Sequence, residues 1–136
     1  MTVLADALPV HEHVEAVLHL HLPPEPRVVP QARAFVLEHA PPLSAQSRDV
    51  LELLTSELVT NAVIHARTVL EVGVTTGAWH VLVTVHDLDV GHQEVEPYGR
   101  DGGRGLGLVA ALAERWDTTT HADGGKTAWF RVRRDG

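Results

Sequence analysis

Two polar residues spaced one helical turn apart, Glu57 and Asn61, are the residues of this chain best suited to chemistry. At about 100° per residue, both fall inside an apolar stripe, with leucines on one flank and Leu53 and Ile64 on the other. A carboxylate and an amide in such a stripe cost free energy unless something pairs with them. The pair is therefore either a site, with a carboxylate proton acceptor and an amide oxygen ligand, or two half-buried residues bonded to a loop.

A second segment with chemical potential is rich in glycine and reads Gly102-Gly103-Arg104-Gly105-Leu106-Gly107-Leu108. It lies immediately before and inside the first turn of an expected helix. Successive glycines let backbone N–H groups point into one concavity, and a helix N-terminus adds positive potential. Both features suit a phosphate group, although a flexible loop with a glycine-rich helix start has the same composition.

The elements that position these residues follow from apolar periodicity and from turn residues. The pattern predicts strands over residues 14–22, 69–75, 79–86, 116–121 and 127–132, and helices over 28–39, from Ser44 or Ser47 to about 66, and over 105–114. A long polar loop is expected over 87–103 and a turn at 76–78. This order predicts an α+β fold, a two-layer α/β sandwich in which a mixed, mostly antiparallel sheet carries its helices on one face.

Bulk properties narrow the class of protein. A chain of 136 residues fits one domain over residues 1–136, of which about the first ten are expected to be poorly ordered. A formal charge of −7 argues against direct binding of nucleic acid, whose phosphates require a basic surface. The sequence contains no cysteine, no evident signal peptide and no apolar run of about 20 residues. We therefore expect a cytoplasmic protein without a membrane partner.

Histidines are numerous, ten in all, and His19 and His21 would share one face of a strand. Two imidazoles on one face could hold a metal ion. No Cys, Asp or Glu completes a recognisable ligand spacing around them. A polar sheet face is the better interpretation.

Taken together, these segments resemble the GHKL, or Bergerat-fold, ATPases, and especially the short ATP-binding domains of bacterial anti-sigma-factor serine kinases. Four landmarks occur in the family's order between about residues 33 and 132: the helix segment 57–66, Asp87, the segment 103–108, and Gly125-Lys126-Thr127. The usual box Asp-x-Gly-x-Gly is weakened here to Asp87-Leu88-Asp89-Val90-Gly91. Either Asp87 or Asp89 therefore reads the base, and the strand that leads directly to Asp87 favours that residue.

The resemblance implies ATP and Mg²⁺ as cofactors. Asn61 would hold Mg²⁺ through its side-chain oxygen, and Glu57 would be the catalytic base. Asp87 would accept the adenine amino proton, and Thr127 would support that contact from the neighbouring strand. The rest of the implied nucleotide-binding set comprises His65, Gly91, Gly103, Arg104, Gly105, Leu106, Gly107 and Leu108.

The same resemblance implies a serine/threonine protein kinase. Such a kinase phosphorylates a small antagonist protein and also sequesters a sigma factor by direct contact. Relatives of this kind also dimerise, so a homodimer is a further implied assembly. The alternatives are a non-catalytic, nucleotide-dependent interaction module of the same fold and a detached ATP-binding subunit that serves another protein's phosphotransfer.

Overall fold

A computed structural model describes residues 7–66, 68–87, 103–122 and 125–136 of the chain. The described elements are, in order, β1 (Val14–Leu22), the 3₁₀ turn η2 (Pro26–Val28), α1 (Val29–His39), α2 (Ala45–His65), β2 (Leu70–Gly77), β3 (His80–Asp87), α3 (Gly103–Leu112), β4 (Arg115–Thr120) and β5 (Lys126–Arg133). The predicted types and order of the elements are confirmed, and their bounds differ from the predicted ones by a few residues.

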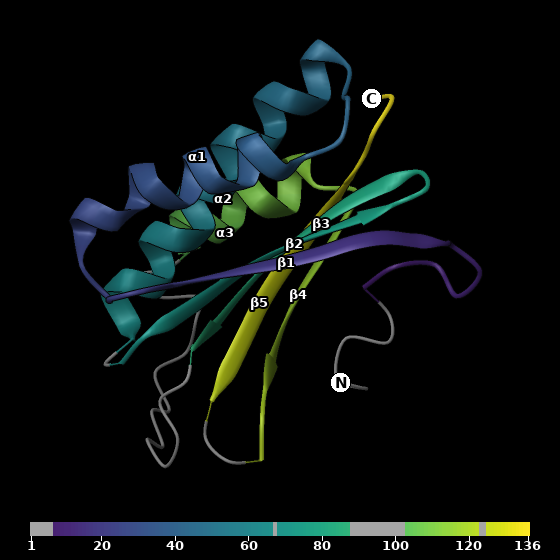
Figure 1. The fold of residues 1–136 in the computed structure, drawn as a ribbon. Helices are drawn as coiled ribbons and strands as arrows, with labels where there is room; N and C mark the ends of the chain where they lie inside the picture. Colours follow the sequence, from purple (N-terminus) through teal and green to yellow (C-terminus); the bar gives the residue numbers. More distant parts are fainter. Residues whose placement is uncertain (1–6, 67, 88–102, 123–124) are drawn as a thin grey trace.

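The five strands form one sheet in the order β1-β2-β3-β5-β4. Each described pairing is antiparallel, so the described sheet is antiparallel and not mixed. Figure 1 shows the three helices together on one face of this sheet, with α2 packed against both α1 and α3. The architecture is therefore the two-layer α+β sandwich that the order of elements predicts.

Helix α2 begins at Ala45 because Ser44 caps it. The Ser44 side-chain oxygen accepts a hydrogen bond from the Ser47 backbone N–H at 3.0 Å. Ser47, the other candidate cap, is buried instead and donates from its hydroxyl to the Arg133 carbonyl at 2.7 Å. These two bonds fix the start of the longest helix against the end of β5.

The core lies between the helices and the side chains that alternate toward them from the strands. Leu51, Leu54 and Leu58 of α2 are buried as predicted, with Val50 and Ala62 packed beside them. The sheet contributes a matching set of buried residues, which are Leu22, Val72, Val74, Val81, Val83, Val85, Ala128, Phe130 and Val132. Period-two alternation thus assigns one parity of β3 and β5 to the helix face and the other parity to the opposite face.

The expected flank of Leu53 and Ile64 is not buried. Leu53 is 40% exposed and Ile64 is 64% exposed, so the prediction that they enclose the polar pair of α2 is wrong. Helix periodicity gives the direction of a side chain, but a neighbouring element must be present to cover it. Here α3 does not cover the side chain of Leu53 or Ile64, so both stay in contact with solvent.

The N-terminal segment packs on the sheet face opposite the helices, where Ala7 contacts Leu82 and Trp129. Glu12 anchors this segment: its Oε2 accepts hydrogen bonds from the backbone N–H groups of Trp79 and His80 at 2.7 and 2.8 Å. Its Oε1 lies 2.6 Å from His80 Nδ1. The side chain of Glu12 has no exposed area, so these three contacts replace the hydrogen bonds that its carboxylate would otherwise make to water.

Glu12→Gln should lower the free energy of unfolding at pH 7 by about 1–3 kcal/mol, because an amide cannot accept all three bonds. Burial alone would raise the pKa of the Glu12 carboxyl, but the donors from Trp79 and His80 outweigh burial and hold that pKa below its ordinary value. The ionised Glu12 side chain therefore stabilises the fold at pH values above about 4.3, the ordinary pKa of glutamate. This stabilisation is lost as the pH falls through the pKa that Glu12 has in the folded protein.

Urea unfolding of both proteins between pH 7 and pH 3 measures this effect. The difference between wild type and Glu12→Gln should shrink as the pH falls below about 4. Glu15→Gln is the control, because Glu15 is half exposed and pairs with Arg134 only at 3.5 Å, so its effect should stay below about 0.5 kcal/mol. A difference for Glu12→Gln that does not change with pH would contradict this account.

Candidate functional site

One side of helix α2 presents three polar residues at successive turns, Glu57, Asn61 and His65. Each step of four residues advances about 6 Å along the helix axis. Glu57 is half-buried, Asn61 is only 4% exposed, and His65 is the last residue of the helix. Glu57 and Asn61, on which the sequence prediction centres, therefore lie on one face of α2. Asn61, the more deeply buried of the two, lies between Glu57 and His65 along the helix.

Helix α2 packs against both α1 and α3 (Figure 1). On the flank toward α1, Arg33 of α1 donates to Ser56 Oγ at 2.9 Å, and Ser56 stands about 140° around the helix from Asn61. Asn61 therefore points away from the side of α2 that Arg33 contacts. Helix α3, which begins with the glycine segment, packs against α2, although about 40 residues separate Asn61 from Gly103 in the sequence.

The amide of Asn61 is incompletely satisfied. Its Nδ2 is buried and has no hydrogen-bond partner within the ranges that the structure describes. A buried amide donor without a partner costs about 1–3 kcal/mol, so such groups are rare in folded proteins unless a ligand uses them. A ligand that accepts a hydrogen bond from Nδ2 would account for this buried donor, whereas most of the loop in the alternative interpretation lies outside the described residues.

A small hollow opens where α2 and β3 end and β5 begins. Asp87, the last residue of β3, lines this hollow with Lys126, the first residue of β5, and the two are paired across the strands. The remaining lining residues are Ala62, His65, Val85 and Ala128. A carboxylate and an ammonium group thus stand at the end of a narrow space with small apolar walls.

Thr127 does not line this hollow. Because successive side chains of a strand alternate, Thr127 points to the sheet face opposite Asp87 and Lys126. There its Oγ1 lies 2.7 Å from His86 Nδ1 and 2.6 Å from His121 Nε2, and the two imidazole rings meet edge to face at 5.0 Å. The structure therefore brings Asp87 together with Lys126 and engages the predicted partner, Thr127, on the other side of the sheet.

The glycine segment forms the first turns of α3. Gly103 begins the helix, and Arg104 and Gly105 follow within its first turn. Leu106 is buried, whereas Gly107 and Leu108 are exposed, and a Cβ at Gly107 would meet no atom within 4 Å. Gly107 is thus not required by internal packing, and its open surface leaves room for a group that approaches from outside. The predicted residues Gly91 and Asp89 lie outside the described residues.

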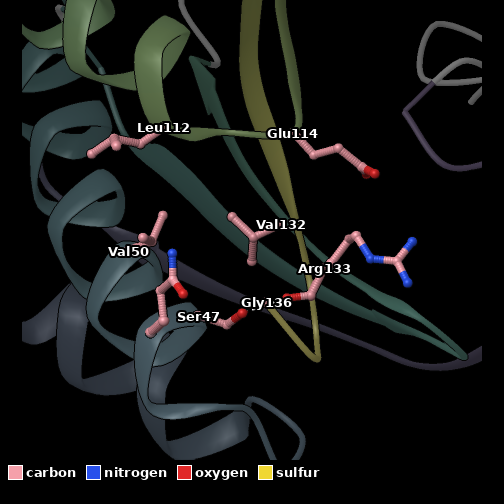
Figure 2. A pocket seen from close by; sticks show the side chains of 8 residues that line it. Ser47, Val50, Leu112, Glu114, Val132, Arg133 and Gly136 are labelled. Atoms are coloured by element: carbon pink, nitrogen blue, oxygen red, sulfur yellow. Dashed lines mark hydrogen bonds between the residues drawn. The ribbon is translucent and has the colours of Figure 1, made fainter.

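A second, larger hollow lies at the other end of β5, between the first turns of α2 and the end of α3 (Figure 2). Its apolar lining consists of Val50, Leu112 and Val132. Figure 2 shows the side chains of Glu114 and Arg133 directed away from this lining. The hollow contains none of the predicted site residues, so it is a poor candidate for the site.

A family of known domains accounts for this arrangement. The model of the family described as histidine kinase-like ATPase domain matches residues 22–132. The chain belongs to this family. The match covers all the elements from the end of β1 to β5, so the fold and the GHKL resemblance are both confirmed. No curated protein matches the chain.

Membership makes this chain an ATP-binding domain of the histidine kinase-like type. His65, the last residue of the polar stripe of α2, also lines the hollow at Asp87, so these two features of the ATPase domain adjoin each other. None of the helices in the described ranges is long and apolar enough to cross a membrane.

Lys126 lines the hollow beside Asp87 but is not among the residues that the sequence predicts for the site. A signal for it was present, because the alternation that buries Phe130 and Ala128 places position 126 on the same face. Counting back from Phe130 would have assigned Lys126, and not Thr127, to the side of Asp87. The glycines just before β5 have no side chain, so they give no sign of this alternation in the sequence.

Proposed function

We propose that this ATPase domain is an ATP-dependent serine/threonine protein kinase of the anti-sigma-factor type. The observation that carries the proposal is the buried Nδ2 of Asn61, which has no hydrogen-bond partner among the described residues and lies one turn from the half-buried carboxylate of Glu57. A phosphoryl-transfer site uses both, one residue as a ligand and the other as a base.

The residues present fit a magnesium–nucleotide complex. Asn61 offers an oxygen, the hard ligand that Mg²⁺ prefers, and its orphaned Nδ2 offers a donor for a phosphate oxygen. When bound, Mg²⁺ supplies neutralisation of the phosphate charge. The N-terminal turn of α3 adds backbone N–H groups on the neighbouring side of α2. Asp87 holds the base at the far end of the site, and His65 lies between Asp87 and Asn61 along α2.

Glu57 then acts on the second substrate, a protein hydroxyl. Its carboxylate accepts the proton of a serine or threonine hydroxyl while the hydroxyl oxygen forms a bond to the γ-phosphorus. The bond from the γ-phosphorus to the β–γ bridging oxygen breaks, and ADP leaves with the electron pair. Positioning and charge stabilisation supply most of the rate, because phosphoryl transfer needs little covalent assistance.

The surface beside Glu57 suits a protein substrate. Leu53 and Ile64 are exposed on the side of Glu57 that faces solvent, about 40° and 20° from it around the helix. Exposed apolar side chains near a reacting group favour a partner that can cover them. In our proposal the partner is a small antagonist protein that is phosphorylated, and a sigma factor is held by the same domain in exchange for it.

A transfer assay with γ-labelled ATP, Mg²⁺ and candidate antagonist proteins tests the proposal. Label should appear on a serine or threonine of the antagonist, with one ADP released for each phosphate transferred. Tight binding of ATP without transfer to any antagonist would replace the kinase by the non-catalytic interaction module. Failure to bind ATP at all would refute both functions.

A further inference from the structure

A buried histidine at the start of β3 lies between two carboxylates that come from distant parts of the chain. His80 Nδ1 lies 2.6 Å from Oε1 of Glu12 in the N-terminal segment, and His80 Nε2 lies 2.6 Å from Oε1 of Glu114, which follows α3. Only 6% of the His80 side chain is exposed. These three residues therefore join the N-terminal segment, the turn between β2 and β3, and the corner between α3 and β4 at one place on the sheet.

This arrangement requires a proton on both ring nitrogens of His80. A neutral imidazole has one N–H, and its other nitrogen presents a lone pair. A neutral ring would therefore place a lone pair 2.6 Å from a carboxylate oxygen, at a buried position where the repulsion is poorly screened. The doubly protonated ring instead donates to Glu12 and carries positive charge beside Glu114.

The charges around His80 balance only when the ring is positive. Glu114 Oε1 also accepts a hydrogen bond from Arg131 Nε at 2.9 Å, so the connected groups are two carboxylates, one guanidinium and the ring. A charged ring gives two charges of each sign, whereas a neutral ring leaves one negative charge in excess. Two further ion pairs lie beside this cluster and do not alter the balance, Arg133 with Asp135 at 3.1 Å and Arg134 with Glu15 at 3.5 Å.

The two carboxylates are not held equally. The Glu12 side chain has no exposed area and also accepts hydrogen bonds from the backbone N–H groups of Trp79 and His80. The Glu114 side chain is 34% exposed, and His80 Nε2 makes no aligned hydrogen bond within the described residues, so its contact with Glu114 depends on charge. Loss of one proton from the ring therefore leaves the other on Nδ1, bonded to Glu12, and frees the Glu114 carboxylate to turn toward water.

We propose that His80 is a pH-dependent clamp on the corner between α3 and β4. Histidine is the side chain whose charge ordinarily changes between about pH 5 and 8. The charged ring holds Glu114 at the acidic end of this range, and the hold is lost as the pH rises. The corner anchors the C-terminal end of α3, the helix that begins with the glycine segment, so the anchoring of this helix is sensitive to pH. The clamp operates whether or not the domain transfers phosphate.

Nuclear magnetic resonance of the full ¹⁵N-labelled chain between about pH 5.5 and about pH 8.5 tests the clamp. The ring ¹⁵N shifts of His80 should show both nitrogens protonated at the acidic end and only Nδ1 protonated at the basic end. Over the same range, the exchange protection factor of the Glu114 amide, which bonds to the Arg131 carbonyl, should fall by about tenfold, as expected for the loss of one charged contact. The amides of Trp79 and His80, which bond to Glu12, should keep their protection.

Glu114→Gln removes the carboxylate that the charged ring holds, so protection of the amide at position 114 should no longer depend on pH. His21→Gln is the matched control, because it removes an exposed histidine that lies 3.2 Å from Glu71 on the same sheet and should leave the pH dependence unchanged. A His80 ring with one protonated nitrogen throughout the range would overturn the clamp. So would protection at Glu114 that does not change with pH, or a pH dependence that persists in Glu114→Gln.

Discussion

Asn61→Ala should reduce the affinity for Mg²⁺–ATP by about 100-fold or more, since it removes an oxygen ligand and a charge-assisted phosphate contact together. The same substitution should change the free energy of unfolding by less than about 1 kcal/mol. Truncating a buried side chain loses packing, but here it also removes an Nδ2 that has no partner among the described residues. Loss of binding without loss of stability is the signature of a ligand site. Titration calorimetry and urea unfolding measure the two effects.

Thr55→Val provides the matched control on the same helix. Thr55 is fully buried, and its Oγ1 likewise lacks a hydrogen-bond partner in the described structure. Valine has nearly the same shape, so the variant should be more stable by about 1 kcal/mol and should bind ATP as wild type does. An Asn61→Ala protein that binds Mg²⁺–ATP normally, or that unfolds far more easily than Thr55→Val, would return Asn61 to a structural role.

Glu57→Gln should slow phosphoryl transfer by about 10²–10⁴-fold, the usual contribution of a positioned base. The amide keeps the size of the side chain and its place on α2, so the affinity for ATP should change by less than about threefold. A variant that binds but does not react isolates the proton-transfer role from ligand binding. Single-turnover transfer from γ-labelled ATP, with ATP affinity measured separately, provides both quantities.

Glu52→Gln is the corresponding control. Glu52 is an exposed carboxylate on α2 that lies 3.9 Å from Arg33, on the flank away from Asn61. Its removal changes the charge of the helix equally and should leave the transfer rate unaltered. If Glu57→Gln transferred phosphate at the wild-type rate, another group would be the base, and the proposed mechanism would need a different proton acceptor.

Long-range contacts were beyond the reach of sequence reasoning. Glu12 and His80 are 68 residues apart, and nothing in either local sequence indicates that one carboxylate accepts three bonds from the turn between β2 and β3. The same holds for the exposure of Leu53 and Ile64. Burial depends on which neighbour covers a side chain, and that is a property of the assembled layers.

Only the tertiary structure decided to which face of the sheet the side chains of Lys126 and Thr127, at the start of β5, point. A shift of one residue moves every side chain of a strand to the other face. That parity separates Thr127, which meets His86 and His121, from Lys126, which meets the hollow of Asp87. The sequence contained the alternation but not the register with β3.

What the sequence determined by itself were the features with local causes. The order of strands and helices, the apolar stripe of α2 and the one-turn spacing of Glu57 and Asn61 follow from periodicities of two and 3.6 residues, which act over a few neighbours. The structure alone decided the antiparallel strand order, the register pairing of Asp87 with Lys126, and the burial of Asn61 Nδ2 without a hydrogen-bond partner in the described part of the chain. These depend on contacts between segments far apart in the chain, and such contacts exist only once the layers have packed.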